Sequence, residues 1–125
     1  MFGTPRWRVE ELTGYKPLTT FWEDFSIADR FGAGAVRGTF RRAFNEWKHD
    51  YKYLTELVMV LNHKIWQFYQ QGKYDRAELY DSLWQKADGY AVEHLKGEEL
   101  QYFAKVGKEL QYFSKVIDRL REVEK

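Results

Sequence analysis

The sequence predicts an all-α protein whose main element is a long antiparallel helical hairpin. Large apolar residues between Phe40 and Phe68 recur alternately four and three positions apart, the spacing of one helix face. Both prolines precede residue 18, so no later helix is interrupted by proline. With 125 residues, the chain is long enough to bury one hydrophobic core. We therefore expect a single helical domain over residues 1–125.

The composition restricts both the compartment and the chemistry of this chain. It contains no cysteine, which excludes disulfides, thiolate metal sites and cysteine nucleophiles. No apolar run is long enough for a signal peptide or a membrane span, so we expect a cytoplasmic protein that does not enter a membrane. The formal net charge is +1, and we do not expect a nucleic acid as the partner.

The N-terminal part is expected to hold an arm and a short helix. Residues 1–18 contain both prolines and form the arm, and residues 19–106 form the helical body. Thr20 followed by Glu23 has the spacing of a capping box at the start of a helix. Glycines 32 and 34 are expected to end that helix. Its apolar positions are Phe21, Trp22, Phe25, Ala28 and Phe31.

One long helix is expected over residues 35–71. At the usual rise it would be about 55 Å long. Leu57 to Leu61 is apolar around the whole circumference, so this section requires more than one neighbouring element. The sustained 3.5-residue repeat predicts coiled-coil-like packing along one side. The repeat consists of Phe40, Phe44, Trp47, Tyr51, Leu54, Val58, Leu61, Ile65 and Phe68.

A second helix over residues 75–96 is expected to return along the first. Gly72 provides the turn, and Asp75 with Glu78 has the spacing of a helix cap. The length of this segment allows it to pack antiparallel against the long helix. Its expected contact positions are Tyr80, Leu83, Ala87, Tyr90 and His94.

The C-terminal part contains a tandem repeat of ten residues. Residues 97–106 read GEELQYFAKV and residues 107–116 read GKELQYFSKV, with eight of ten positions identical. A single helix from 75 to 124 would extend past its partner and expose an apolar stripe. Either the chain folds back at Gly97 or Gly107, or a second copy of the protein covers the duplicated tail, residues 107–125.

Large apolar residues in the arm, the first helix and the tail are candidates for an interface, because aromatic side chains often anchor contacts between proteins. Such an interface would join a homo-oligomer, most simply a dimer, or a host protein. The candidates are Trp7, Tyr15, Trp22, Phe113, Ile117 and Leu120.

A cluster of basic residues is the best candidate for a ligand site. At the start of a helix, beside free backbone N–H groups, it would hold a phosphate or another anion, for example on a nucleotide. The alternative is a solvated surface paired with nearby carboxylates. The cluster consists of Arg30, Arg37, Arg41, Arg42 and Lys48.

No pattern in the sequence predicts catalysis, a cofactor or a metal. The segment GAGAVRG, from Gly32 to Gly38, fails as a dinucleotide fingerprint because no strand precedes it. His49, Glu56 and His63 are spaced seven residues apart, too far to share a metal within one helix, and are expected to be exposed. We therefore expect a protein that is not an enzyme.

Three segments carry a resemblance to a known family. They read TTFWEDFSIADRFG, TFRRAFNEWKHDYKYLTELVMVLNHKIWQFY and LYDSLWQKADGYAVEHLKGEELQYF. Over about residues 19 to 103, the chain resembles small uncharacterised proteins of phages, prophages and mobile elements in gut bacteria. The resemblance implies a helical domain in the cytoplasm of a bacterial host cell, and it transfers no activity and no catalytic residue.

Together these observations give three hypotheses of function. The first is a non-enzymatic interaction or oligomerisation protein of phage or mobile-element origin, which binds a host protein, for example one of host defence, or a second copy of itself. The second is a binder or sponge for a nucleotide or another phosphate-bearing ligand, held by the arginine cluster. The third is a nucleic-acid-binding accessory protein, which the near-neutral charge disfavours.

Overall fold

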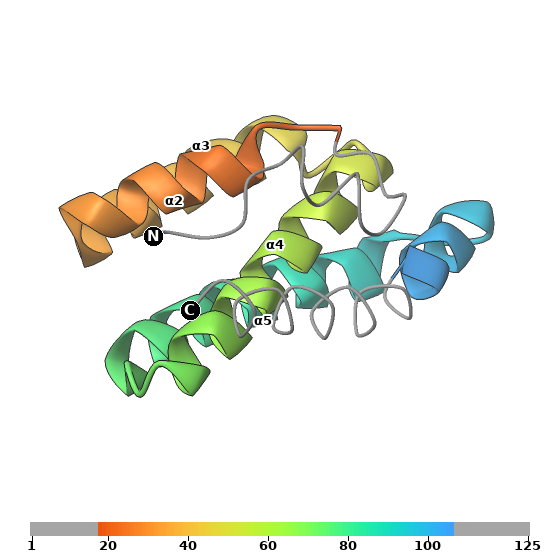
Figure 1. The fold of residues 1–125 in the computed structure, drawn as a ribbon. Helices are drawn as coiled ribbons and strands as arrows, with labels where there is room; N and C mark the ends of the chain where they lie inside the picture. Colours follow the sequence, from red (N-terminus) through yellow and green to blue (C-terminus); the bar gives the residue numbers. More distant parts are fainter. Residues whose placement is uncertain (1–17, 107–125) are drawn as a thin grey trace.

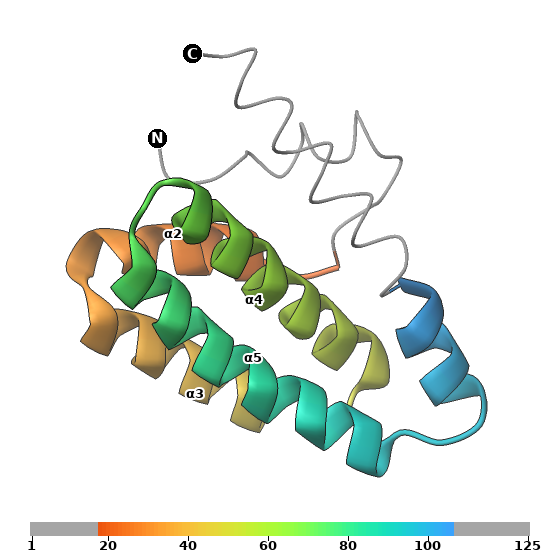
Figure 2. The same ribbon diagram turned by 90° about the horizontal axis from the view of Figure 1, so that it is seen from below.

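The computed structural model describes residues 18–106, and these form an all-α fold (Figure 1). The named helices are α2 (Phe21–Phe31), α3 (Ala33–Trp47), α4 (Tyr51–Gln70) and α5 (Tyr74–His94). Residues 98–106 are also helical. Successive helices from α2 to α5 reverse direction along the chain, so the fold consists of two antiparallel hairpins (Figures 1 and 2).

The two hairpins pack on one another as layers. The α2–α3 hairpin lies over the α4–α5 hairpin, and α4 contacts α3, α2 and α5 (Figure 1). The expected all-α class and the antiparallel return of the chain along α4 are confirmed. Leu57 and Val60 are completely buried, in agreement with the expectation of more than one neighbour at the middle of α4.

The expected continuous helix over residues 35–71 is wrong, because the chain breaks between α3 and α4. The backbone of Asp50 is extended, and its carboxylate accepts hydrogen bonds from the backbone N–H groups of Lys52 at 3.1 Å and Tyr53 at 3.3 Å. An aspartate in this position satisfies N–H groups that would otherwise lack partners, which favours the start of a new helix.

The apolar repeat nevertheless marks the core on both sides of the break. The connection from residue 48 to residue 50 is short, and the core sides of both helices face the same interior. Six of the nine repeat residues are buried and three are half-buried. The buried ones are Phe40, Phe44, Leu54, Val58, Leu61 and Phe68, and the half-buried ones are Trp47, Tyr51 and Ile65.

The start of α2 also differs from the expected capping box. The Thr20 hydroxyl donates to Asp24 at 2.9 Å instead of capping the helix, and the backbone N–H of Phe21 donates to the Thr19 hydroxyl at 3.2 Å. The end agrees better, since Gly32, with φ of 109°, separates α2 from α3. Its positive φ is a conformation that glycine adopts more readily than other residues.

The two ends of α5 refine the expected boundaries. The helix begins at Tyr74, after Gly72 with φ of 74°, so Asp75 lies in its first turn and does not cap it. Beyond Leu95 the chain folds back at Gly97, which has φ of 60°. The fold-back at Gly97, one of the alternatives left open by the sequence, is therefore confirmed, whereas Gly107 and the duplicated tail lie outside the described residues.

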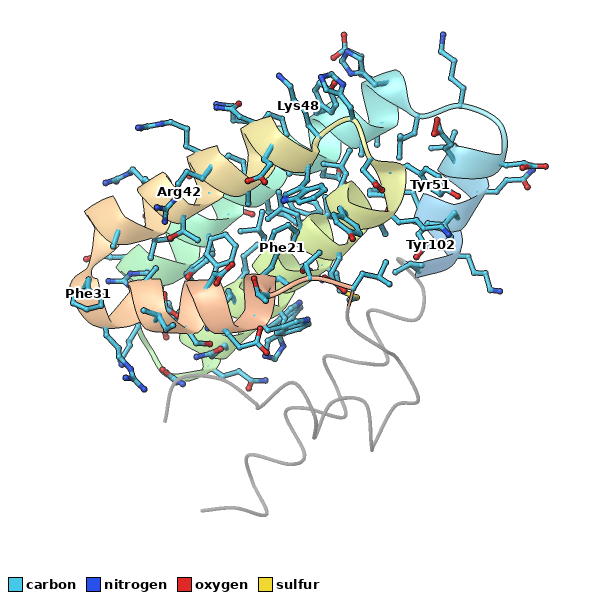
Figure 3. All side chains as sticks on the ribbon, turned by 90° about the horizontal axis from the view of Figure 1, so that it is seen from above. Phe21, Phe31, Arg42, Lys48, Tyr51 and Tyr102 are labelled. Atoms are coloured by element: carbon cyan, nitrogen blue, oxygen red, sulfur yellow. The ribbon has the colours of Figure 1, made fainter. Side chains whose placement is uncertain are left out.

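The first copy of the tandem repeat returns toward the start of α4. The rings of Tyr102 and Tyr51 meet edge to face with centroids 5.3 Å apart (Figure 3), and Val106 is buried. The second copy and the rest of the tail, residues 107–125, lie outside the described residues, as does most of the arm, residues 1–17. The interface candidates Trp7, Tyr15, Phe113, Ile117 and Leu120 therefore lie there.

Candidate functional site

A groove between α2 and α3 forms a hollow on the described surface, with a volume of about 1010 Å³. We call it the α2–α3 groove. Its walls are formed by one side of each helix of the first hairpin, and Tyr53, near the start of α4, also lines it. The residues that line the groove include Asp24, Ile27 and Phe31 on α2, and Ala35, Gly38, Thr39, Arg41, Arg42, Ala43 and Glu46 on α3.

The α3 wall is hollow because its residues are small. Ala35, Gly38 and Thr39 follow one another on the side of the helix that faces α2. A Cβ atom added at Gly38 would meet no atom within 4 Å, so the space above this glycine is open. At these three positions the α3 wall therefore lacks the large side chains that would close the hollow, whereas Arg41, Arg42 and Glu46 line it farther along the helix.

The α2 wall, in contrast, carries large apolar side chains that extend into water. Ile27 is 54% exposed and Phe31 is 77% exposed. Leu18, at the other end of the groove, is 42% exposed. Scattered apolar residues on a surface are ordinary, but these three line one hollow, which is typical of a contact surface.

Two positive and two negative side chains line the same groove. Arg41 and Arg42 come from α3, together with Glu46, whereas Asp24 comes from α2. Figure 3 shows Arg42 on the α3 side, with Phe31 at the end of α2 next to the turn. All four charged residues are exposed, and within residues 18–106 none of them forms an ion pair.

The structure does not bring the five cations of the predicted anion site together. Arg41 and Arg42 line the groove, but they lie about 12 Å along α3 from its first residue. Arg37 is exposed and does not line the groove, and Arg30 lies in the last turn of α2. Lys48 lies at the opposite end of α3, over the ring of Phe44. The five cations are therefore distributed along the first hairpin, from the last turn of α2 to the C-terminal end of α3.

Trp22, a candidate for an exposed interface, is a core residue instead. It is 3% exposed, and its ring lies 5.2 Å from the imidazole of His63. The helical spacing of Trp22 with Phe25 indicated correctly that both lie on the buried side of α2.

The expectation that Glu56 and His63 are exposed is wrong, since both are completely buried on α4. The carboxylate of Glu56 accepts a hydrogen bond from the backbone N–H of Leu18 at 2.8 Å and another from the Thr19 hydroxyl. These bonds hold the start of the first hairpin against α4. Glu56 directly precedes the section Leu57 to Leu61, which is apolar around the whole helix. That neighbouring section was the available sign that the side of α4 carrying Glu56 is covered too.

The two other histidines lie on either side of Tyr90. His49 is exposed, and its Nδ1 is 3.4 Å from the Tyr90 hydroxyl. His94, which was expected at a half-buried contact position, is exposed, and its ring stacks on Tyr90 with centroids 3.9 Å apart. Within residues 18–106, no three histidine or acidic side chains are placed to hold a metal ion.

The sequence analysis did not identify a buried ionic cluster between the two hairpins. The Asp29 carboxylate, on α2, is bonded to Lys64 of α4 at 2.9 Å and to Arg76 of α5 at 3.2 Å. It also accepts a hydrogen bond of 2.5 Å from the hydroxyl of Tyr80. The side chains of Asp29 and Lys64 are each 1% exposed. This cluster fixes the position of α2 relative to the other hairpin.

The cluster also changes the acidity of Tyr80. Burial raises the pKa of its phenol far above the ordinary value, and the negative charge of Asp29 and the hydrogen bond to it raise the pKa further. The positive charge of Arg76 acts in the opposite direction. Tyr80 packs between Phe25 and Phe68, with ring centroids 5.9 and 5.7 Å away, so the phenol is enclosed on its apolar sides.

Comparisons of the chain with models of protein families, with curated proteins and with solved structures found no match. Within residues 18–106, no helix combines the length and the apolar character needed to cross a bilayer.

Replacing Asp29 with alanine should lower the free energy of unfolding by about 3–5 kcal/mol, because Lys64 would remain buried without this carboxylate. The double variant Asp29→Leu/Lys64→Met, which replaces the pair with apolar side chains, should recover most of that loss. Chemical denaturation measures both. Glu93→Ala, at an exposed position of α5, is the control and should stay within about 0.5 kcal/mol. A loss below about 1 kcal/mol for Asp29→Ala would contradict this role of the cluster.

Stability should fall at alkaline pH because of Tyr80. Above the ordinary pKa of 10.0, the phenol of the unfolded chain ionises while the folded chain keeps its proton. The folded state then binds more protons, so this contribution is complete below about pH 10 and is lost as pH rises further. Relative to Tyr80→Phe, the wild type should lose about 1.4 kcal/mol of unfolding free energy between about pH 9 and pH 11. Denaturation at several pH values measures the unfolding free energy of both proteins. If the two free energies changed in parallel over this pH range, this role of Tyr80 would be refuted.

Proposed function

We propose that this chain is a non-enzymatic protein-interaction protein whose contact surface is the α2–α3 groove. The observation that carries the proposal is the juxtaposition of exposed Ile27 and Phe31 with the hollow above Gly38. Grooves between helices commonly accept an apolar side chain or an amphipathic helix from another protein. The exposed charges around the groove supply the polar rim that such interfaces have.

The geometry of the lining supports binding better than chemistry. Guanidinium and carboxylate groups lie at the mouth of an open groove, where they remain in contact with water. Catalytic acids and bases usually work in sites that exclude water, where burial adjusts their pKa values. The strongly perturbed phenol of Tyr80 is buried in the ionic cluster and does not line this groove.

We also propose that the protein is of phage or mobile-element origin and acts in the cytoplasm of a bacterial host cell. The resemblance of three segments to proteins of phages, prophages and mobile elements supports this part of the proposal. On this proposal, the contact through the groove is made either with a host protein or with a second copy of the chain.

Photo-crosslinking from the groove tests the proposed function. With p-benzoyl-phenylalanine at position 31, irradiation in bacterial cells should attach a protein to the chain, because this side chain is 77% exposed at the groove. The same group at Val92, which is 59% exposed on α5, is the matched control and should give no such adduct. Electrophoresis and mass spectrometry identify the adduct.

A second substitution links that adduct to the groove itself. Gly38→Trp places a large ring in the hollow and should abolish the adduct, whereas Gly89→Trp, at an exposed glycine of α5, should not. Equal adducts from positions 31 and 92, or an adduct that survives Gly38→Trp, would argue against the groove as a contact surface. Circular dichroism of each variant establishes that it is folded.

A second candidate function is the binding of a phosphate-bearing ligand, such as a nucleotide. Its support is that Arg37, Arg41 and Arg42 are exposed and form no ion pair with a carboxylate within residues 18–106. Guanidinium groups bind phosphate oxygens in pairs of hydrogen bonds, and Arg41 and Arg42 lie beside a groove large enough for a nucleotide.

A thermal-shift series with ATP, GTP and inorganic phosphate tests this candidate. A ligand at about 100 times its dissociation constant adds about 2.7 kcal/mol of stability, which raises the melting temperature of a small domain by several degrees. The variant Arg41→Gln/Arg42→Gln should remove the shift, while Lys52→Gln, an exposed change on α4, should retain it. An unchanged melting temperature with every compound excludes this candidate.

A further inference from the structure

We infer that the occupant of the α2–α3 groove is the same groove of a second copy of this chain, in a two-fold symmetric dimer. This inference rests on the proposed function, because it specifies the partner for the surface proposed there. In a two-fold interface each residue that contacts a second residue is matched by the reverse contact. Such a surface must carry both members of every contact. The α2–α3 groove carries large apolar side chains as well as a hollow, and acidic as well as basic side chains.

The geometry of the hairpin places the large apolar side chains of α2 opposite the small residues of α3. α2 and α3 run antiparallel from the turn at Gly32, so residues at equal distance from this glycine lie at the same level along the groove. Phe31 and Ala35 are one and three residues from Gly32, and Ile27 and Gly38 are five and six residues from it, so the members of each pair lie within about 3 Å of the same level. The large side chains on one wall thus lie at the levels where the other wall is hollow.

The charges follow the same rule. Asp24 on α2 is eight residues from Gly32, and Arg41 and Arg42 on α3 are nine and ten residues from it, so these charges lie within about 3 Å of the same level. Within one copy, no ion pair joins these residues across the groove in the described structure. The lining as a whole carries two acidic and two basic side chains. A partner of one charge sign would therefore meet repulsion and attraction equally, whereas a second copy has the matching pattern.

A two-fold axis parallel to the groove satisfies shape and charge together. Rotation about this axis exchanges the α2 wall with the α3 wall and preserves the level of each residue. It brings Phe31 and Ile27 of one copy to within about 3 Å of the levels of Ala35 and Gly38 of the other, and Asp24 to within about 3 Å of the level of Arg42. The missing Cβ at Gly38 gives the isoleucine of the second copy room to approach.

The size of the surface predicts a weak, reversible dimer. α2 and α3 have 11 and 15 residues, so they are about 16 and 22 Å long, and two helices side by side are about 20 Å wide. The face therefore measures about 400 Å² per copy, below the roughly 800 Å² per partner of a standard stable interface. We expect a micromolar dissociation constant.

Sedimentation or light scattering of the full chain, from about 1 to about 100 µM, tests the inference. The wild type should change from monomer to dimer over this range. Gly38→Trp should remain monomeric, and the matched change Gly89→Trp should dimerise as the wild type does. Arg42→Glu should weaken dimerisation at least about tenfold by placing two acids together.

A charge exchange within one chain gives the most specific result. The variant Asp24→Arg/Arg42→Glu should restore dimerisation, because a two-fold contact places both changed residues opposite each other. These two positions are exposed, and circular dichroism separates loss of association from loss of folding. A chain that is monomeric at the highest concentration, or a dimer indifferent to Gly38→Trp and to Arg42→Glu, would overturn the inference. A monomer that still gives the position-31 adduct with another protein would retain the proposed function.

Discussion

The Asp29 carboxylate is the interaction on which the arrangement of the two hairpins depends. It lies at the end of the bundle away from the short connection between α3 and α4, and it joins α2 to Lys64 of α4 and to Arg76 and Tyr80 of α5. Apolar surfaces tolerate small shifts against one another, but a buried carboxylate that moves away from its cations loses several kcal/mol. The connection fixes one end of the first hairpin, and the ionic cluster fixes the other.

This constraint also determines which surfaces remain available. The core sides of α2 and α3 are held against α4 and α5, and Glu56 holds the start of the first hairpin by its bonds to the Leu18 backbone and the Thr19 hydroxyl. The remaining sides of α2 and α3 form the groove, where the small residues of α3 leave space. A contact surface on a rigidly held hairpin requires little reorganisation when a partner binds, which favours association.

The sequence predicted the fold class, the return of α5 and most of the core, because apolar spacing records which side of a helix is buried. It did not predict the break at Asp50, since the repeat keeps its phase from Phe44 to Leu54 across the connection. Residue type misled the analysis at Glu56 and His63, which are polar and buried. The groove was not predictable either, because it depends on which residues of α2 and α3 face each other. From the sequence, Phe31 was only one of the apolar positions that define the first helix, with no sign that it is exposed.

The two acids of α2 illustrate how the inside and the outside of this hairpin are related. Asp24 and Asp29 are five residues apart, so their side chains point about 140° away from each other around the helix. Asp29 faces the second hairpin and finds its cations there. Asp24 faces the groove within about 3 Å of the level of Arg42, and within residues 18–106 it forms no ion pair. In both directions an acid of α2 lies close to the level of a base on another helix. On the inner side, cations of the same chain pair with Asp29. On the outer side, a second copy would supply the base for Asp24, and the two-fold symmetry would form this contact twice in each dimer.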